Sequence, residues 1–323
     1  ICIIISHDRE FLNNTTNTIF EIDEKKLNIF TGNYDDYVIQ KVGWIEKREK
    51  AFSVQEKKRE HLEKLLKSAR SIKSGDKRGK AVKSAKKRIE REVKTEEITA
   101  YEEQKLKDIN IESAMHNKKL VLDISDLSFA YPKSEPLLID TNFTIYGNEK
   151  VWFYGKNGIG KTTLIKLILG SSAEQDQKNI LPTSGTIRIG ESISWAYFSQ
   201  DQSHLPKNKT VREYIIEETN IDFSRSFGAL EKFLFPKHLQ NYTIQELSPG
   251  QRARLSFVVF AQKKYDFLIL DEPTNHLDIK TKEVIEQAIK EFTGAILLIS
   301  HDRYFVEHIH CDRAITLQNQ KIM

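Results

Sequence analysis

Two kinds of apolar pattern divide this chain. Between residues 60 and 95 the apolar positions recur at helical spacing, first at Leu62, Leu65, Leu66, Ala69 and Ile72 and then at Val82, Ala85, Ile89 and Val93. This period predicts two long helices joined at Ser71–Lys80, a helical hairpin. After residue 119 the apolar residues come in short unbroken runs instead, at 151–154, 267–270 and 295–299. Runs of this length are typical of buried parallel strands, so we expect an α/β domain preceded by the hairpin.

A glycine-rich loop carries the first candidate chemistry. The apolar strand 151–154 is followed by Gly155-Lys156-Asn157-Gly158-Ile159-Gly160-Lys161-Thr162 and then by the apolar helix 164–169. Strand, GxxxxGK[ST] and helix in this order indicate a Walker A motif, in which backbone N–H groups and a helix N-terminus bind phosphates. We expect Lys161 to reach the β- and γ-phosphates and the Thr162 hydroxyl to ligate Mg²⁺. The alternative, a glycine turn that merely starts a helix, is disfavoured by the acidic pair further along the chain.

That acidic pair, Asp271 and Glu272, directly follows the apolar run 267–270. A central strand delivers such residues at its C-terminal end, where ligand sites form in α/β sheets. Asp271 is suited to holding Mg²⁺ through water, and Glu272 to polarising an attacking water as general base. Two adjacent acids could also cap the next helix, but the Walker A motif upstream makes this the minor alternative.

The heptapeptide Ile-Ser-His-Asp-Arg-x-Phe occurs twice, at residues 5–11 and 299–305. With a shift of one residue the similarity continues, because Phe20, Ile22, Lys26 and Leu27 align with Ile315, Leu317, Lys321 and Ile322. A period this long indicates duplicated domains. Only one phosphate loop is present and the chain begins with Ile, so we interpret it as the C-terminal part of a tandem protein whose first nucleotide-binding domain is otherwise missing.

Charge is unevenly distributed along the chain. Residues 64–94 contain thirteen Lys or Arg against three Asp or Glu, a net of +10 within a chain of net +4, so the remainder sums to −6. A localised basic block favours contact with a polyanion. A charged, solvated spacer between two domains is the alternative, but it does not require so many positive charges near one turn.

The ordered motifs resemble an ATP-binding-cassette (ABC) nucleotide-binding domain, an α/β P-loop fold with a helical subdomain. Leu247-Ser248-Pro249-Gly250-Gln251 resembles the LSGGQ signature, Gln200 the Q-loop, Leu277-Asp278 the D-loop and His301 the switch histidine. The resemblance implies ATP and Mg²⁺ as cofactors and ATP hydrolysis as the activity. It implies an ATP site of Tyr131, Gly155, Asn157, Gly158, Gly160, Lys161, Thr162 and Thr163, a metal site of Thr162, Gln200 and Asp271, and catalysis by Glu272, His301 and Gln200.

Pro249 departs from the signature, in which glycine stands at this position. Proline is acceptable at a helix start because its missing N–H would be unpaired there. It nevertheless removes one backbone donor from a loop that holds the opposing γ-phosphate, so we expect retained binding and an effect on rate.

Within the cassette proteins, Glu272-Pro273-Thr274-Asn275-His276-Leu277-Asp278 and Gly32-Asn33-Tyr34-Asp35-Asp36-Tyr37 resemble the ABC-F family. The resemblance implies a cytoplasmic translation factor on the ribosome near the exit-site and P-site tRNAs, either housekeeping or protective against antibiotics. Its RNA contacts would be Lys73, Lys77, Arg78, Lys80, Lys83, Lys86, Lys87 and Arg88. We expect the end of a first cassette at residues 1–31, the linker hairpin at 32–115 and the second cassette at 116–323.

The resemblance also implies two ATP molecules sandwiched between two cassettes. Ser248, Gly250 and Gln251 would then serve the nucleotide of the missing cassette, to which His7 also belongs, and this chain alone would hydrolyse ATP poorly. An ABC ATPase that acts on DNA and the ATPase subunit of a transporter remain alternatives. Against a membrane role, no run approaches the roughly 18 apolar residues of a membrane span. Cys2 and Cys311, with no CxxC motif, suit a reducing cytosol.

Overall fold

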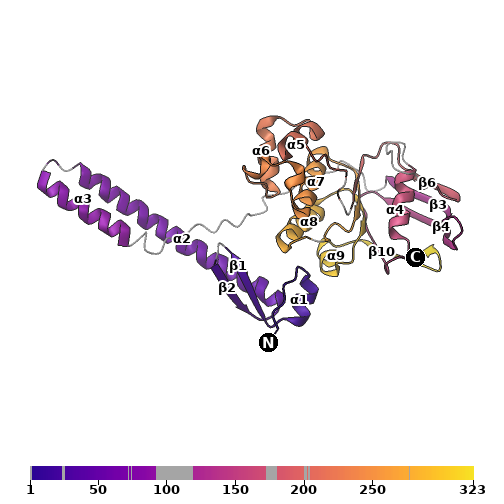
Figure 1. The fold of residues 1–323 in the computed structure, drawn as a ribbon, viewed down its shortest axis with the longest axis horizontal. Helices are drawn as coiled ribbons and strands as arrows, with labels where there is room; N and C mark the ends of the chain where they lie inside the picture. Colours follow the sequence, from indigo (N-terminus) through magenta and orange to yellow (C-terminus); the bar gives the residue numbers. More distant parts are fainter. Residues whose placement is uncertain are drawn as a thin grey trace. The chain divides into compact units, whose positions relative to one another are not determined.

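The computed structural model describes residues 2–23, 26–71, 73, 75–91, 119–171, 180–199, 202, 204–275 and 277–323 (Figure 1). The chain divides into two compact units, one made of residues 1–10 and 106–323 and the other of residues 11–105. No helix in the described residues is long and apolar enough to cross a membrane.

The larger unit is built on a six-stranded sheet with the order β11-β10-β5-β9-β8-β7. The strands are β5 (Lys150–Tyr154), β7 (Trp195–Phe198), β8 (Phe267–Asp271), β9 (Ala295–Ile299), β10 (Arg313–Gln318) and β11 (Lys321–Ile322). All neighbours pair in parallel except β10 and β11, which are antiparallel. The carboxyl ends of β5, β8 and β9 therefore lie at one edge of the sheet, where the candidate site forms.

Both faces of this sheet are covered. Along β8, Phe267 and Ile269 belong to one apolar core while Leu268 and Leu270 belong to the other, and β9 alternates in the same way. The unbroken apolar runs of the sequence are explained by this arrangement, since every residue of a doubly covered strand is buried. The first core lies against α4 (Lys161–Gly170) and a three-stranded antiparallel sheet of β3 (Leu120–Ala130), β4 (Pro136–Tyr146) and β6 (Ser184–Ile189).

The second core contains the helices on the other face. These are α5 (Val211–Thr219), α6 (Phe223–Lys232), α7 (Pro249–Lys263), α8 (Ile279–Glu291) and α9 (Arg303–Ile309), with short 3₁₀ turns at Leu239–Asn241 and Ile244–Glu246. Helices α5, α6 and α7 form a helical group beside the sheet (Figure 1).

The smaller unit contains most of α1 (Arg9–Thr15), whose first two residues belong to the larger unit, the antiparallel pair β1 (Thr18–Asp23) and β2 (Lys26–Thr31), and the helices α2 (Tyr34–Arg70) and α3 (Gly75–Ile89). Helix α2 starts with a capping box, in which Asn33 and Asp36 bond each other's main-chain N–H. Helices α2 and α3 run side by side (Figure 1), with Leu62, Ala69 and Ala85 buried.

The predicted joint of this hairpin was too long. Helix α2 ends at Arg70 and α3 begins at Gly75, so Gly75 is the first residue of α3 and Gly79 lies inside the helix rather than in the turn. A glycine in a helix interior costs only about 1 kcal/mol relative to alanine, which the packing of α3 against α2 can offset. Val93 of the predicted second helix lies outside the described residues.

The repeated heptapeptide is also a structural repeat. Helices α1 and α9 both begin at its arginine, and both copies form the same turn, with Asp8 N–H donating to Ser6 Oγ and Asp302 N–H to Ser300 Oγ at 3.1 Å each. The hairpins that follow have one register, since Ile22 pairs with Leu27 and Leu317 with Ile322. Their burial differs, because Leu317 is 4% exposed and Ile22 is 80% exposed.

Candidate functional site

The glycine loop between β5 and α4 has the backbone of a phosphate-binding loop. Gly155, Gly158 and Gly160 all have positive φ, of 151°, 81° and 114°. A Cβ on Gly160 would lie 2.9 Å from Leu137 Cδ2, so conformation and space both require glycine there. The loop leads into the N-terminus of α4 at Lys161, where main-chain N–H groups face the position of an anion.

Lys161 folds back over this loop. Its Nζ donates to the carbonyls of Gly155 at 2.6 Å and Lys156 at 3.2 Å. Burial lowers the pKa of the Lys161 ammonium, and the carboxylates of Glu272 and Asp271 oppose that shift. The cation is therefore close enough to the acidic pair to interact with it.

The start of α4 also meets Tyr131, one of the expected ATP-site residues. The hydroxyls of Tyr131 and Thr163 lie 3.0 Å apart, and the half-exposed Tyr131 ring packs edge-on against Phe129 at 4.9 Å. Asn157 and Thr162 are exposed on the loop and the first helical turn. The structure thus brings Tyr131, the loop and α4 together on one side of the sheet edge.

Asp271 and Glu272 are buried at the end of β8. Burial raises the pKa of Asp271, while the Lys161 charge opposes the shift. Burial also raises the pKa of Glu272 to about 7, against the hydrogen bond from the His301 backbone. Among the described residues no donor bonds to the buried Oε1 of Glu272. A buried carboxyl with one oxygen left for another ligand and a pKa near neutrality is suited to accept a proton from water.

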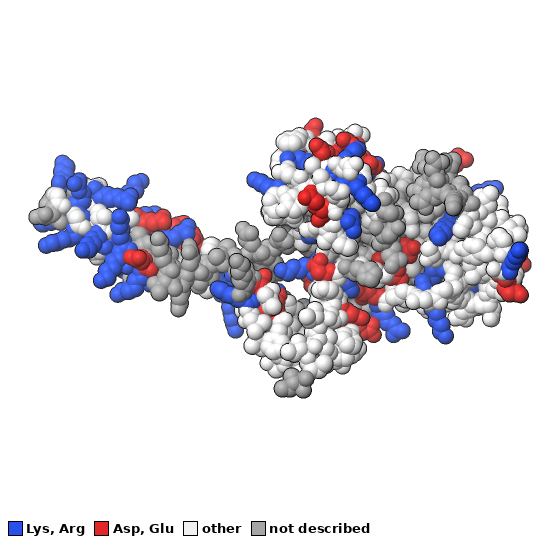
Figure 2. All heavy atoms as spheres, in the orientation of Figure 1, with Lys and Arg blue, Asp and Glu red and all other residues white. Residues whose placement is uncertain are grey.

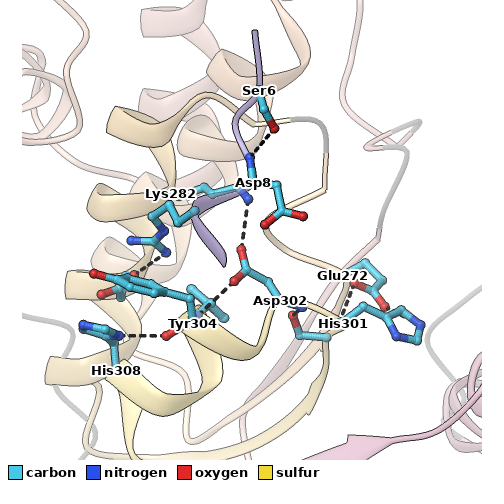
Figure 3. Close-up of polar contacts among 12 residues, drawn as sticks. Ser6, Asp8, Glu272, Lys282, His301, Asp302, Tyr304 and His308 are labelled. Atoms are coloured by element: carbon cyan, nitrogen blue, oxygen red, sulfur yellow. Dashed lines mark hydrogen bonds and ion pairs between the residues drawn. The ribbon is translucent and has the colours of Figure 1, made fainter. Parts of the chain in front are cut away.

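His301 lies beside Glu272 in Figure 3. The His301 N–H donates to Glu272 Oε2 at 3.2 Å, and its ring Nε2 is 3.4 Å from Oε1. Burial, together with the Lys161 charge, lowers the pKa of the imidazole. The neutral ring can therefore donate or accept a hydrogen bond at the γ-phosphate position.

The segment around His301 is fixed from both sides. The Trp152 indole donates to the Ser300 carbonyl at 3.0 Å, and Asp302 caps α9 by accepting from the Phe305 N–H at 3.0 Å. Lys282 Nζ donates to the second Asp302 oxygen at 2.9 Å (Figure 3). These bonds hold the histidine relative to β5 and α8.

The signature segment forms the N-terminus of α7. Ser248 is the N-cap and forms a capping box with Gln251, with distances of 3.2 Å to the Gln251 N–H and 2.8 Å from the Ser248 N–H to Gln251 Oε1. Pro249 stands at the first helical position, where no N–H partner is needed. Gly250 is buried, and a Cβ added there would lie 3.4 Å from Oδ2 of Asp278, which caps α8 through Thr281. The signature and the D-loop therefore lie close together.

The predicted Q-loop residue Gln200 lies outside the described residues. Its described neighbour Gln202 is buried and connects this loop to α7, because its amide donates to the Ser199 carbonyl and its Oε1 accepts from Ser256 Oγ.

The residues present fit ATP and Mg²⁺. The glycine loop and Lys161 offer positive charge and N–H donors to phosphate, and the Thr162 hydroxyl with the Asp271 carboxylate supplies the oxygen ligands that Mg²⁺ prefers. Burial raises the pKa of Asp271 because it destabilises the charged carboxylate, and a bound cation would stabilise that carboxylate.

The eight predicted RNA contacts lie along α3 and in the connection that precedes it. Figure 2 shows Lys and Arg gathered around these two helices. Lys73 is in the connection, and the other seven, all on α3, are Lys77, Arg78, Lys80, Lys83, Lys86, Lys87 and Arg88. All eight side chains are exposed, so their charges face solvent rather than a protein core.

Sequence reasoning missed the supporting residues Trp152, Lys282, Gln202 and Arg9. Each acts through a partner that is distant in the sequence, from 20 positions for Lys282 and Asp302 to 277 for Arg9 and Glu286. No fixed spacing encodes such pairs. For Arg9 alone a signal exists, since it belongs to the repeated heptapeptide.

Two family models, both described as ABC transporter, match residues 138–275 and 20–111. The chain is 34% identical over 95% of its length to ABC transporter F family member 5 of Arabidopsis thaliana, covering 43% of that protein. It is 32% identical over 95% of its length to the ATP-binding protein Uup of Escherichia coli, covering 47% of that protein. The chain therefore spans less than half the length of these relatives.

Among solved structures, cbiO1 of Clostridium perfringens, part of the ABC transporter complex cbiONQ, matches with a TM-score of 0.50 and 22% identity. The match covers 64% of this chain and 88% of that one and concerns the fold alone. The predicted fold class, a P-loop α/β cassette preceded by long helices, is confirmed.

Proposed function

Because the chain belongs to the ABC-F family of ATP-binding cassette proteins, we propose that it binds and hydrolyses ATP and acts on the ribosome near the exit-site and P-site tRNAs. The observation that carries the proposal is the pairing of the buried Glu272 with the half-exposed His301 at the carboxyl edge of the sheet, within electrostatic reach of Lys161.

The reaction is the hydrolysis of ATP to ADP and phosphate. Bound ATP supplies the phosphoanhydride bond, and Mg²⁺ neutralises its charge. Ionised Glu272 accepts a proton from the attacking water, whose oxygen forms the new bond to the γ-phosphorus while the bridging oxygen leaves with ADP. Lys161 and His301 stabilise the charge on the transferred group, and the lowered pKa of His301 keeps its ring neutral for this role.

A first cassette of the same polypeptide is the proposed partner in the ATP site. Support comes from the exposed apolar side chains of β1 and β2, which are Phe20, Ile22, Leu27 and Ile29. The repeat counterparts of Phe20 and Ile22, which are Ile315 and Leu317, are buried within a cassette. Ser248 and Gly250 would then bind the nucleotide of that other cassette. This chain alone is expected to bind ATP and to hydrolyse it slowly.

Ribosomal RNA and tRNA are the proposed ligands of the basic hairpin. Exposed Lys and Arg side chains contact phosphates without reading sequence, which gives affinity with a strong dependence on salt. The same charges would attract DNA, and an ABC-F protein that acts on DNA is the competing function. Both nucleic acids require the hairpin, so the experiment must compare them directly.

The test is ATP-dependent co-sedimentation with ribosomes across a salt series, using full-length protein with Glu272→Gln and the corresponding change in the first cassette. Neutralising the general base is expected to hold the ATP-bound form. Changing Lys77, Arg78 and Lys80 to Gln should weaken pelleting and reduce the slope of log K against log salt by roughly 2. The matched control changes the exposed Lys133, Lys207 and Lys237 of the cassette and should leave pelleting unchanged.

Failure to pellet at low salt would overturn the ribosomal proposal. Preferential binding to branched DNA in a competition with ribosomes would favour the DNA-acting ATPase instead.

A further inference from the structure

Within the larger unit, Arg9 at the start of α1 contacts helices α8 and α9. Arg9 is only 3% exposed. Its Nη2 donates to Glu286 Oε2 on α8 at 2.8 Å, and its guanidinium lies 4.2 Å from the centroid of the Tyr304 ring on α9. One arginine of the first heptapeptide thus joins both helices.

These two helices also fix the switch histidine. Lys282 on α8 bonds Asp302, the cap of α9 and the neighbour of His301 (Figure 3). Tyr304 follows two residues later, and its ring stacks on His308 at 4.1 Å with an interplanar angle of 20°. A contact that shifts Tyr304 or Glu286 therefore shifts the helices that position His301 against Glu272.

Arg9 is buried because of the groups that it contacts, and not because of its position in the heptapeptide. Arg303 occupies the same position in the second heptapeptide, yet it is exposed. A buried guanidinium is costly unless it is paired, so the carboxylate of Glu286 and the flat face of Tyr304 are the groups that make this position favourable. Together they form a receptor for an arginine.

We propose that the α8–α9 face is the docking surface for the switch segment of the first cassette, residues 5–9 in this chain, and that Arg9 is a positioning residue for His301. The inference rests on the proposed ATPase function and adds a route by which one cassette supports hydrolysis in the other. His7 and His301 occupy equivalent positions in the two copies, so the docked arginine joins the two switch segments directly.

The kinetic test compares Arg9→Met, Glu286→Gln and the double variant in the full-length protein, with Arg303→Met as the matched control. Arg9→Met is expected to lower kcat about tenfold and to leave KM within about twofold, because nucleotide contacts stay intact while the histidine is displaced. The double variant should fall no further than Arg9→Met, since both changes remove one interaction. Arg9→Lys keeps the ion pair but loses the stacking and should lie in between.

An unchanged kcat in Arg9→Met, or independent losses that multiply in the double variant, would overturn the positioning role.

A second readout needs no ATP turnover. In this chain, Arg9→Met should lower Tm by about 2–4 °C, with the double variant losing less than the sum of the single changes. Additive changes in Tm would overturn the docking even if hydrolysis is intact. If the unaltered protein hydrolyses no ATP, the proposed function fails, and the Tm comparison still decides the docking.

Discussion

Glu272 and His301 meet at the ends of neighbouring strands. The main-chain N–H of His301 lies 3.2 Å from Glu272 Oε2, and its ring Nε2 lies 3.4 Å from Oε1. Because β8 and β9 are adjacent and parallel, with Asp271 opposite Ile299, each strand delivers its functional residue to the same edge. The pairing of these strands, rather than any loop, sets the geometry of the candidate base and the switch histidine.

Changing Glu272 to Gln should lower ATP turnover by about 100- to 10,000-fold, the contribution typical of a general base. The amide keeps the size of the side chain and can still accept from the His301 N–H, so ATP affinity should be retained. Single-turnover hydrolysis and equilibrium binding of ATP measure the two effects. Glu307→Gln, an exposed position on α9, is the control. Comparable turnover in Glu272→Gln would exclude Glu272 as the base.

The nucleotide-free protein should become less stable as pH rises toward neutrality. Burial raises the pKa of Glu272 from an ordinary 4.5 to about 7. Between these values the folded state holds a proton that the unfolded chain has released, so the free energy of unfolding falls with rising pH. The stabilisation that Glu272 contributes is fully present below the pKa of its carboxyl in the unfolded chain. It is lost as the pH rises through the pKa of about 7 in the folded state.

The measurement is the unfolding free energy at about pH 5 and about pH 8, below and above most of this titration. Glu272→Gln should reduce the difference in unfolding free energy between these two pH values, whereas Glu307→Gln should not. Equal slopes in the parent protein and Glu272→Gln would contradict the raised pKa.

Local spacing in the sequence predicted much of this architecture. The order of strand, glycine loop and helix at 151–169 needs only neighbouring residues, and the apolar runs at 267–270 and 295–299 reflect burial on both faces of the sheet. The repeated heptapeptide predicted a duplication that extends to the same turn and the same hairpin register.

The features that the sequence did not predict depend on contacts between residues far apart in the chain, or on small differences in helix propensity. The burial of Arg9 requires Glu286 and Tyr304, and no pattern in the first heptapeptide distinguishes it from the exposed Arg303. The joint of the hairpin was predicted too long because Gly75 and Gly79 suggested a turn. Helical packing overcame a propensity difference of about 1 kcal/mol.

Changing Trp152 to Phe should weaken catalysis through the backbone that precedes His301. The phenyl ring fills most of the same space but cannot donate to the Ser300 carbonyl, which the indole reaches at 3.0 Å in a buried position. An unpaired buried carbonyl costs about 1–3 kcal/mol, so stability should fall by that order. We expect kcat to fall more than KM rises, measured by steady-state hydrolysis beside thermal unfolding. Trp44→Phe, on α2, is the control for loss of an indole elsewhere. A kcat equal to that of the parent protein would show that this bond does not position His301.

Substituting alanine at two glycines should give opposite results. Gly160 has a φ of 114°, and an added Cβ would lie 2.9 Å from Leu137, whereas around Gly79 in α3 there is open space for a Cβ. Gly160→Ala should therefore destabilise the protein by roughly 1–3 kcal/mol and weaken ATP binding, because the phosphate loop must change its backbone. Gly79→Ala should stabilise the hairpin by about 0.5–1 kcal/mol and leave ATP binding unchanged. Chemical denaturation and ATP titration measure both effects. Unimpaired ATP binding in Gly160→Ala would mean that the positive φ of this residue is not required for the phosphate site.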